Sequence, residues 1–172
     1  IISNCIFDGY IEGENNPYIT VIVDHCLFLG STGHFSQLKN PVITNNVFMN
    51  NFPTGTTNGT YLNNMCRTAG TFPLAGNSGS DNLDATDPML VNYTYNQFYS
   101  TAHDYHLQAG SAAIAAGNDA TDIGIHGGTS KFSESGEVLI NPIMRSVIIT
   151  NPVISPNGTL NVDIHATKPT SN

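Results

Sequence analysis

The sequence has few charged residues and almost no basic ones. Charged side chains make up 10% of its 172 residues, and five Lys and Arg stand against 13 Asp and Glu, a formal net charge of −8. Nucleic acids and anionic membrane surfaces attract proteins through clusters of basic side chains. We therefore expect neither of them as a partner.

Long apolar runs and helical apolar patterns are also missing. The chain has no apolar run of about 18 residues, so the sequence predicts no membrane-spanning segment. No stretch sustains the 3.6-residue apolar period of a helix. Lys and Glu, which favour helices, are scarce, whereas Gly, Asn, Ser and Thr are abundant. This composition favours an all-β fold.

The sequence does contain a repeat in its first third. Three stretches match: I-S-N-C-I-F-D-G from Ile2, V-D-H-C-L-F-L-G from Val23 and I-T-N-N-V-F-M-N from Ile43. Phe7, Phe28 and Phe48 share one position, and a weaker fourth copy begins at Tyr61. A period of about 20 residues is typical of stacked arrays, in which each unit buries its apolar face against its neighbours. Alternating apolar and polar residues within each copy indicate short strands.

Such a unit, with short strands and no helix, predicts one coil of a parallel β-helix. A leucine-rich horseshoe has a similar period, but its leucine-asparagine consensus is absent from this sequence.

The middle of each copy carries a polar pair that we call the bend pair. The four pairs are Asn4-Cys5, His25-Cys26, Asn45-Asn46 and Asn63-Asn64. Asn tolerates left-handed backbone conformations, which suits a tight bend between two strands. Stacked coils would place these side chains about 4.8 Å apart, where Asn amides form a hydrogen-bonded ladder. The alternative is that these Asn residues reflect loop composition alone.

The three cysteines, Cys5, Cys26 and Cys66, match no zinc-binding spacing. Cys5 and Cys26 would stack on adjacent coils about 4.8 Å apart, farther than a disulfide prefers between Cβ atoms. We expect free, buried thiols.

The character of the sequence changes at Asp87. Four strings follow: D-P-M-L-V-N from Asp87, D-Y-H-L-Q from Asp104, G-S-A-A-I-A-A-G from Gly110 and T-D-I-G-I-H-G-G from Thr121. Together they resemble the closing segment of secreted bacterial right-handed parallel β-helix proteins of the broad pectate-lyase-like superfamily. Two positions depart from that pattern: Ala113, where relatives often carry Pro, and Ala115, where they often carry Asp.

The resemblance and the repeat together predict a right-handed parallel β-helix, a single-stranded solenoid, over residues 1–128. Residues 87–128 would be its closing segment, and 129–172 a small C-terminal β appendage. Ser111 before the Ala-rich run 112–116 predicts a one-turn helix beside the last coil. We also expect the chain to be the C-terminal part of a longer secreted or cell-surface protein, because an exposed first coil invites aggregation.

In the appendage, Val147 to Ile149, Val153-Ile154 and Leu160 to Ile164 have strand-like patterns. Asn157-Gly158 between them is a good turn sequence.

The resemblance implies a polysaccharide as the substrate or binding partner. Lyases of that superfamily use Lys or Arg as a base, often with Ca²⁺ held by carboxylates. The basic residues here are Lys39, Arg67, Lys131, Arg145 and Lys168. Lys39 and Arg67 are not one coil apart, so we do not expect a catalytic pair, and solvated surface charges are the default.

Carboxylates and histidines give other candidates. Hydrolases need two or three convergent carboxylates, and Asp81, Asp84 and Asp87 are close in sequence. Ca²⁺ binding there is an alternative to turn or capping roles, although the calcium-loop pattern is absent. His103 and His106 could hold a metal, but the strand around them favours a structural role.

Asp24 and His25 lie within the repeat itself. Because His25 occupies a ladder position, we expect it to hydrogen-bond with neighbours rather than to act as an acid or base.

Tyr93, Tyr95 and Tyr99 could stack on sugar rings if they are exposed. The function that the sequence favours is an extracellular scaffold that binds or presents a surface to polysaccharide, with no complete active site, no cofactor and no assigned metal ligand. Two alternatives stay open: the C-terminal part of a polysaccharide lyase or glycoside hydrolase, and an adhesin-like surface protein.

Overall fold

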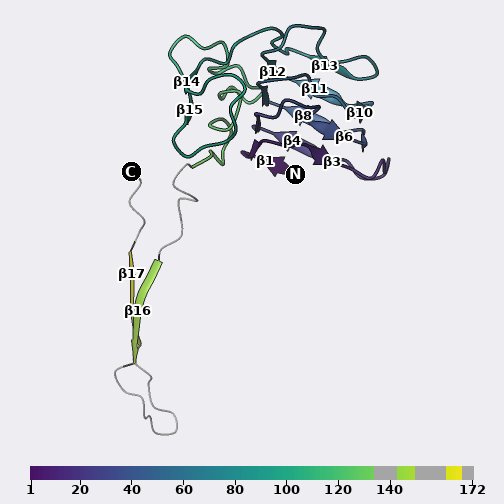
Figure 1. The fold of residues 1–172 in the computed structure, drawn as a ribbon. Helices are drawn as coiled ribbons and strands as arrows, with labels where there is room; N and C mark the ends of the chain where they lie inside the picture. Colours follow the sequence, from purple (N-terminus) through teal and green to yellow (C-terminus); the bar gives the residue numbers. More distant parts are fainter. Residues whose placement is uncertain (134–142, 150–161, 168–172) are drawn as a thin grey trace. The chain divides into compact units, whose positions relative to one another are not determined.

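The computed structural model describes residues 1–133, 143–149 and 162–167. Contacts divide the chain into two units, Ile1–Phe132 and Ser133–Asn172. In the first unit, short parallel strands stack coil upon coil (Figure 1). The described residues contain no helix. The prediction of an all-β parallel β-helix is confirmed.

Two parallel sheets make up most of each coil. The first sheet contains β1 (Ile2–Ser3), β4 (Ile22–Asp24), β8 (Val42–Thr44), β11 (Thr60–Leu62) and β13 (Ser78–Ser80), in that order. The second contains β2 (Ile6–Phe7), β5 (Leu27–Phe28), β9 (Val47–Phe48) and β12 (Met65–Cys66). Shorter pairs complete the coils: β3 (Ile11–Glu12) with β6 (Phe35–Ser36), and β7 (Leu38–Lys39) with β10 (Thr56–Thr57).

The register of these sheets matches the sequence repeat. Val23 pairs with Ile2 and Ile43, and Tyr61 pairs with Ile43, so the fourth copy begins where the sequence predicted it. Inside the coils, the Phe28 ring stacks on Phe7 and on Phe48, with 4.9 Å between ring centroids in each case. The three phenylalanines therefore form a single column.

The bend pairs have the left-handed backbone that the sequence predicts. The first residue of each pair has a positive φ: 49° at Asn4, 49° at His25, 56° at Asn45 and 51° at Asn63. At this bend the chain passes from the first sheet to the second, and the two residues of a pair point to opposite sides of the coil wall.

The second residues point inward and form the predicted ladder. Asn46 Oδ1 accepts the Cys26 amide hydrogen at 2.8 Å, and Asn64 Oδ1 accepts that of Asn46 at 2.9 Å. Asn82 Oδ1 accepts the Asn64 amide hydrogen at 2.9 Å. We call Asn46, Asn64 and Asn82 the inner ladder. The ladder is confirmed, and it reaches one coil further than the sequence indicated.

That further coil lies after the fourth copy, which is the last that the sequence analysis identified. β13 pairs there with β11, and Asp81 repeats the left-handed φ, at 57°. The repeat escapes notice because Gly79 stands where the other coils have an apolar residue. A Cβ at Gly79 would collide with the Tyr61 carbonyl oxygen, so the close approach of these two strands requires glycine.

The closing segment forms an antiparallel pair, β14 (Leu90–Asn92) and β15 (Asp104–Leu107), beside the stack (Figure 1).

The one-turn helix predicted at 112–116 is wrong. Turns replace it, with Ala115 at a φ of 52°. The Ala115 amide donates to Asp122 Oδ1 at 2.9 Å, and the Ala113 carbonyl accepts from the Ile123 amide at 2.9 Å. Hydrogen bonds to Asp122 and Ile123, in the segment that follows, thus replace those of a helix.

All three cysteines are free, as predicted. Cys26 and Cys66 are buried and Cys5 is half-buried. Burial raises the pKa of the Cys26 thiol to about 12, so this sulfur stays protonated at neutral pH.

In the second unit, β16 (Ile143–Ile149) pairs antiparallel with β17 (Val162–Thr167). The strand prediction at Val147 to Ile149 is confirmed. Of the predicted strand Leu160 to Ile164, Val162 to Ile164 is confirmed, and Leu160-Asn161 lie outside the described residues. Val153-Ile154 and the Asn157-Gly158 turn lie outside the described residues. Within the described part of the chain, no helix has the length and apolar character needed to cross a membrane.

His34 is a buried polar group within the aromatic interior. Its ring lies 5.2 Å from both Phe28 and Phe48, and Nε2 donates to the Asn51 carbonyl at 3.0 Å. Nδ1 has no hydrogen-bond partner among the described residues. Burial lowers the pKa of His34 to about 4, so the ring is neutral in the folded protein at neutral pH.

Replacing a member of the inner ladder should destabilise the fold. Asn64→Ala leaves the buried Asn46 amide and Ile43 carbonyl without the partners they have now. Each unsatisfied buried group costs about 1–3 kcal/mol, so we expect the free energy of unfolding to fall by about 3 kcal/mol in urea titrations. The exposed Thr57→Ala is the control and should stay within about 0.5 kcal/mol of wild type. A loss below about 1 kcal/mol for Asn64→Ala would refute the ladder's role.

His34 should make stability depend on pH. Its pKa is about 4 in the folded protein against 6.5 for the unperturbed group, so below pH 6.5 the unfolded chain binds a proton that the folded chain does not. Stability should therefore fall between pH 6.5 and 4.5, and His34→Phe should reduce that fall by on the order of 2 kcal/mol. Denaturant unfolding at several pH values measures the difference. Between pH 7 and 8 the free energies of unfolding of the two proteins should depend on pH in the same way. The same dependence between pH 6.5 and 4.5 would contradict the prediction.

Candidate functional site

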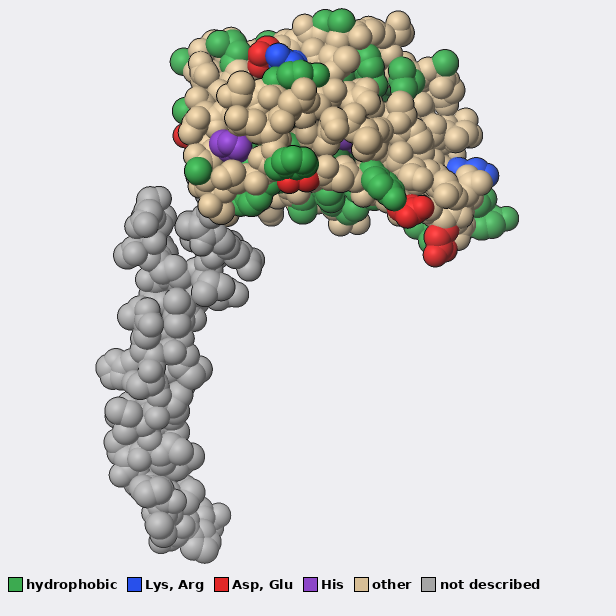
Figure 2. Space-filling view, in the orientation of Figure 1, with side chains coloured by type: hydrophobic (Ala, Val, Ile, Leu, Met, Phe, Trp, Pro, Cys, Tyr) green, Lys and Arg blue, Asp and Glu red, His purple; other side chains and the backbone are tan. Residues whose placement is uncertain are grey.

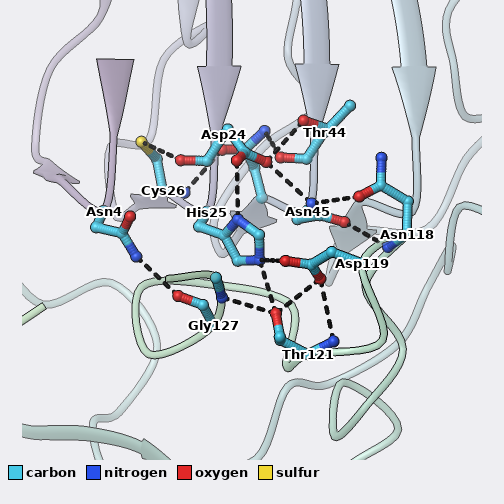
Figure 3. A network of polar contacts seen from close by, with 12 residues as sticks. Asn4, Asp24, His25, Cys26, Thr44, Asn45, Asn118, Asp119, Thr121 and Gly127 are labelled. Atoms are coloured by element: carbon cyan, nitrogen blue, oxygen red, sulfur yellow. Dashed lines mark hydrogen bonds and ion pairs between the residues drawn. The ribbon is translucent and has the colours of Figure 1, made fainter. Parts of the chain in front are cut away.

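Residues 116–127 run back across the coils, and we call them the return segment. They bind the first residue of each bend pair. Figure 3 shows these contacts for Asn4, His25 and Asn45. On the fourth coil, Asn63 Nδ2 donates to the Ala116 carbonyl at 3.0 Å. On the third, Asn45 Nδ2 donates to Asn118 Oδ1 and Asn45 Oδ1 accepts from the Asn118 amide, both at 2.9 Å.

The same pattern continues to the first coil. Asn4 Nδ2 donates to the carbonyl oxygens of Ile125, at 2.9 Å, and Gly127, at 3.0 Å. Successive coils toward the N-terminus thus hold successively later residues of the return segment. The polar column that the sequence identified serves as a docking strip for the end of the solenoid domain.

His25 is the most buried member of this strip, with 1% of its surface exposed. Its Nδ1 lies 3.0 Å from Asp24 Oδ2, a carboxylate oxygen to which it donates. On the other side of the ring, Nε2 lies 3.1 Å from Thr121 Oγ1 and 3.6 Å from Asp119 Oδ2 (Figure 3). As expected from the sequence, His25 hydrogen-bonds with neighbours, and it links the second coil to the return segment.

The carboxylates on either side of His25 are held in their ionised form. Burial alone would raise the pKa of Asp24, but hydrogen bonds with His25, Thr44 and Asn45 outweigh it and lower that pKa. Burial also acts to raise the pKa of Asp119, and hydrogen bonds from the Thr121 hydroxyl and amide, with the neighbouring His25, lower it overall. The network is therefore charged and internally paired.

The order Asp24, His25, Thr121 resembles an acid, base and nucleophile in series. The Thr121 hydroxyl is committed elsewhere, since it donates to Asp119 Oδ1 and accepts from the Gly128 amide, both at 2.7 Å. The ring of His25 is covered as well, because a Cβ at Gly127 would collide with it. The arrangement therefore fastens the return segment, and the Thr121 hydroxyl hydrogen is directed at Asp119 rather than at His25.

Docking of the closing segment also builds a second apolar core. The outer face of the second sheet packs against the closing segment through Leu27, Val47, Met65, Leu90, Tyr105, Ala113, Ile123 and Ile125. This core holds β14 and β15 against the coils, and with them residues 93–103, which connect the two strands.

An open cleft of about 310 Å³ lies where this connection meets the fourth coil. We call it the Arg67 cleft, and its wall includes Arg67, Asp87, Met89, Tyr93, Tyr95 and Gln108. It combines aromatic rings, a cation, a carboxylate and an amide. Such a mixture of apolar faces and hydrogen-bonding groups is typical of a site for a polar ligand.

The charged groups of the cleft are arranged around one tyrosine. The guanidinium carbon of Arg67 lies 4.4 Å from the centroid of the Tyr95 ring, a cation–π contact. Arg67 Nε also lies 3.5 Å from Asp87 Oδ2, at the limit of a hydrogen bond. Tyr95 remains 45% exposed, so its ring is supported by Arg67 and still accessible.

The structure separates the other candidates that the sequence proposed. Lys39 lies in β7 and Arg67 follows β12, so the two belong to different sheets. Lys131 is exposed, the side chain of Arg145 is not described, and Lys168 lies outside the described residues.

The three aspartates have separate local partners. Asp81 accepts from the Ser80 hydroxyl, Asp84 from the Ala85 amide, and Asp87 from the Met89 amide, besides its contact with Arg67. Within residues 1–133 and the two strands of the second unit, no group of three or more His, Cys, Asp or Glu could hold a metal ion.

The two histidines of the closing segment also point to different neighbours. His103 Nδ1 lies 3.2 Å from the Tyr105 hydroxyl. His106 lies 2.7 Å from Asp104 and stacks on His126, with 3.8 Å between ring centroids. The structure does not bring His103 and His106 together.

Of the three predicted tyrosines, only Tyr95 and Tyr99 are exposed, at 45% and 43%. Tyr93 is half-buried and lines the Arg67 cleft. Sequence reasoning missed the pairing of Arg67 with Asp87. The signal was present, because these residues are 20 positions apart, which is one coil.

Comparison with protein-family models, with curated protein sequences and with solved structures gives no match to this chain.

Removing one docking contact should loosen the return segment. Asn45→Gly deletes the amide that binds Asn118, and glycine keeps the left-handed backbone accessible. Amide hydrogen exchange at Asn118 should accelerate at least about tenfold, equivalent to about 1.4 kcal/mol of local opening. Asn58→Gly is the matched control, since Asn58 is exposed and has a similar φ of 54°. Equal exchange in both variants would show that the contact does not hold the segment.

Proposed function

We propose that this protein is an extracellular β-solenoid that binds polysaccharide through the Arg67 cleft. The observation that carries the proposal is the Tyr95 ring, which is half exposed in an open cleft and supported by the Arg67 guanidinium. Sugar rings offer apolar faces edged by hydroxyl groups, and an aromatic ring beside charged and amide groups complements both. Rigid aromatic side chains are also the usual anchors of binding sites, because they lose little conformational entropy.

The composition of the surface is compatible with an uncharged, hydroxyl-rich partner. On the face drawn in Figure 2, Lys and Arg side chains are few and well separated, and most atoms belong to other polar residues or to the backbone. The chain as a whole has five Lys and Arg. Such a surface offers no strong attraction to partners that bind through a basic patch.

The resemblance of residues 87–128 to secreted bacterial β-helix proteins of the pectate-lyase-like superfamily supports the same reading. The closing segment lies beside a parallel β-helix, the setting that the resemblance implies. We include membership of that superfamily, and secretion or display at the cell surface, in the proposal. Fold-level likeness is a weak guide to chemistry, so the binding role rests on the cleft.

We favour binding over catalysis because of where the basic residues lie. The cation of the Arg67 cleft is paired with Asp87, and Lys39 belongs to another sheet. A lyase base must be free to take a proton from the sugar. An enzyme assembled from these coils together with further ones is the rival, and it would release unsaturated products from uronate polymers.

A glycan array probed with the full chain tests the proposal. We expect the wild-type chain to retain at least one polysaccharide class, and Tyr95→Ala to weaken binding more than about tenfold, or 1.4 kcal/mol. Tyr18→Ala is the matched control, since Tyr18 is 94% exposed and does not line the Arg67 cleft. Wild-type protein that retains no glycan, or equal effects of the two substitutions, would reject a carbohydrate site at this cleft.

A further inference from the structure

A second and larger hollow lies next to the Arg67 cleft. Its volume is about 480 Å³, and its wall includes Asp8, Ser31, Thr32, Asn50, Asn96 and Phe98. We call it the Phe98 cleft. Except for the phenylalanine, these side chains all carry oxygen or nitrogen atoms that hydrogen-bond.

The two clefts are contiguous. Met49 lines the Arg67 cleft and the next residue, Asn50, lines the Phe98 cleft. Likewise, Tyr95 lines the Arg67 cleft, and the next residue, Asn96, lines the Phe98 cleft. Together the clefts extend from the first coil to the fourth, since Arg67 follows the second-sheet strand of the fourth coil and Asp8 that of the first. With coils about 4.8 Å apart, this is a length of roughly 15 Å.

The chain segment between the clefts is anchored to the coils. The Asn96 amide donates to Asn50 Oδ1 at 3.3 Å, on the third coil. The Tyr99 amide donates to the Asp8 carboxylate, with its nearer oxygen at 2.9 Å, on the first coil. Hydrogen bonds to two coils thus hold the segment before any ligand arrives, which lowers the entropic cost of binding.

Each cleft has its own accessible aromatic ring. Phe98 is 81% exposed at the second cleft, and Tyr95 is 45% exposed at the first. A large exposed apolar ring contributes nothing to the core, but it offers a flat surface to a ligand face. Two such rings along one path favour a ligand with repeated apolar faces.

The charges along this path disfavour an acidic ligand. The charged side chains lining the two clefts are Arg67, Asp87 and Asp8, and the single cation is already paired with Asp87. The chain itself carries a net charge of −8. A polymer with a carboxylate on every ring would meet like charge along the whole site, which costs affinity.

We propose that the Arg67 and Phe98 clefts form one extended site for a neutral glycan chain, which lies across segment 94–98 and reaches from the fourth coil to the first. This inference rests on the proposed function and adds the class of the glycan and the length that is bound. Hydroxyl groups of the chain bind the carboxylate, amide and hydroxyl groups of both clefts, and two sugar faces lie on Tyr95 and Phe98.

Calorimetric titration with oligosaccharides of defined length tests the extended site. The probes are oligomers of glucose, xylose and mannose, from disaccharide to hexasaccharide. Affinity for one of these neutral series should rise at least about tenfold between its disaccharide and its tetrasaccharide, because only the longer chain fills both clefts. If longer oligomers bind no more tightly than the shortest one that binds, the Phe98 cleft is not part of the binding site.

Oligogalacturonates of the same lengths test the class of glycan. We expect them to bind at least about tenfold more weakly than the best neutral series at low salt, and the gap should narrow as salt screens the carboxylates. Tighter binding of the oligogalacturonates, or of oligomers of the cationic sugar glucosamine, would overturn the assignment to neutral glycans.

Two substitutions locate the two ends of the bound chain. Phe98→Ala should weaken tetrasaccharide binding about tenfold and leave disaccharide binding, anchored at Tyr95, unchanged. Tyr95→Ala should weaken both. Tyr18→Ala should weaken neither, since it is exposed and lines neither cleft. Because Phe98 is 81% exposed, its loss should not affect folding, which thermal unfolding can verify.

The outcomes separate the two proposals. If neutral oligomers bind and Tyr95→Ala abolishes binding, but Phe98→Ala has no effect at any length, the extended site is wrong and the Arg67 cleft stands. If no oligosaccharide of any charge binds, both proposals are wrong.

Discussion

The bend pair is the constraint on which the rest of this structure depends. At each bend, a residue in the left-handed conformation turns its side chain outward, and the next residue turns inward. The inward side chains satisfy buried backbone groups through the inner ladder, which the surrounding aromatic side chains could not do. The outward side chains bind the return segment. One local conformation therefore stabilises the stack from inside and fastens the closing segment from outside.

Repetition made the fold readable from the sequence. Phe7, Phe28 and Phe48 share an environment because they share a position in successive coils, so the pattern predicts both strand and stacking. The prediction failed where repetition was broken by a local requirement. Gly79 fills an inward position because the neighbouring strand passes too close for a Cβ, and a glycine in place of an apolar residue hides the coil. The Ala-rich run 112–116 looks helical by composition, but its backbone groups bond to Asp122 and Ile123 in the segment that follows.

The candidate site was far less predictable, because it is made by contacts between segments distant in sequence. Tyr95 could be recognised as an aromatic candidate, whereas its support by Arg67 depends on how the closing segment docks on the fourth coil. The pair of Arg67 and Asp87 is separated by one coil, and the repeat could have indicated it. The Phe98 cleft has no sequence signature, since residues from three coils and one connecting segment meet there. The proposed site thus belongs to the segments that lie on the repeat rather than to the repeat itself.

The direct test of this account is the order of contacts along the docking strip, measured by nuclear Overhauser effects from the Asn side-chain amides. We predict that the Asn63 amide protons are close to Ala116, those of Asn45 to Asn118, and those of Asn4 to Ile125 and Gly127. This series corresponds to a return segment that crosses the coils from the fourth to the first. Contacts in the reverse order, or none between these amides and residues 116–127, would contradict the central claim that the bend pairs hold the closing segment in place.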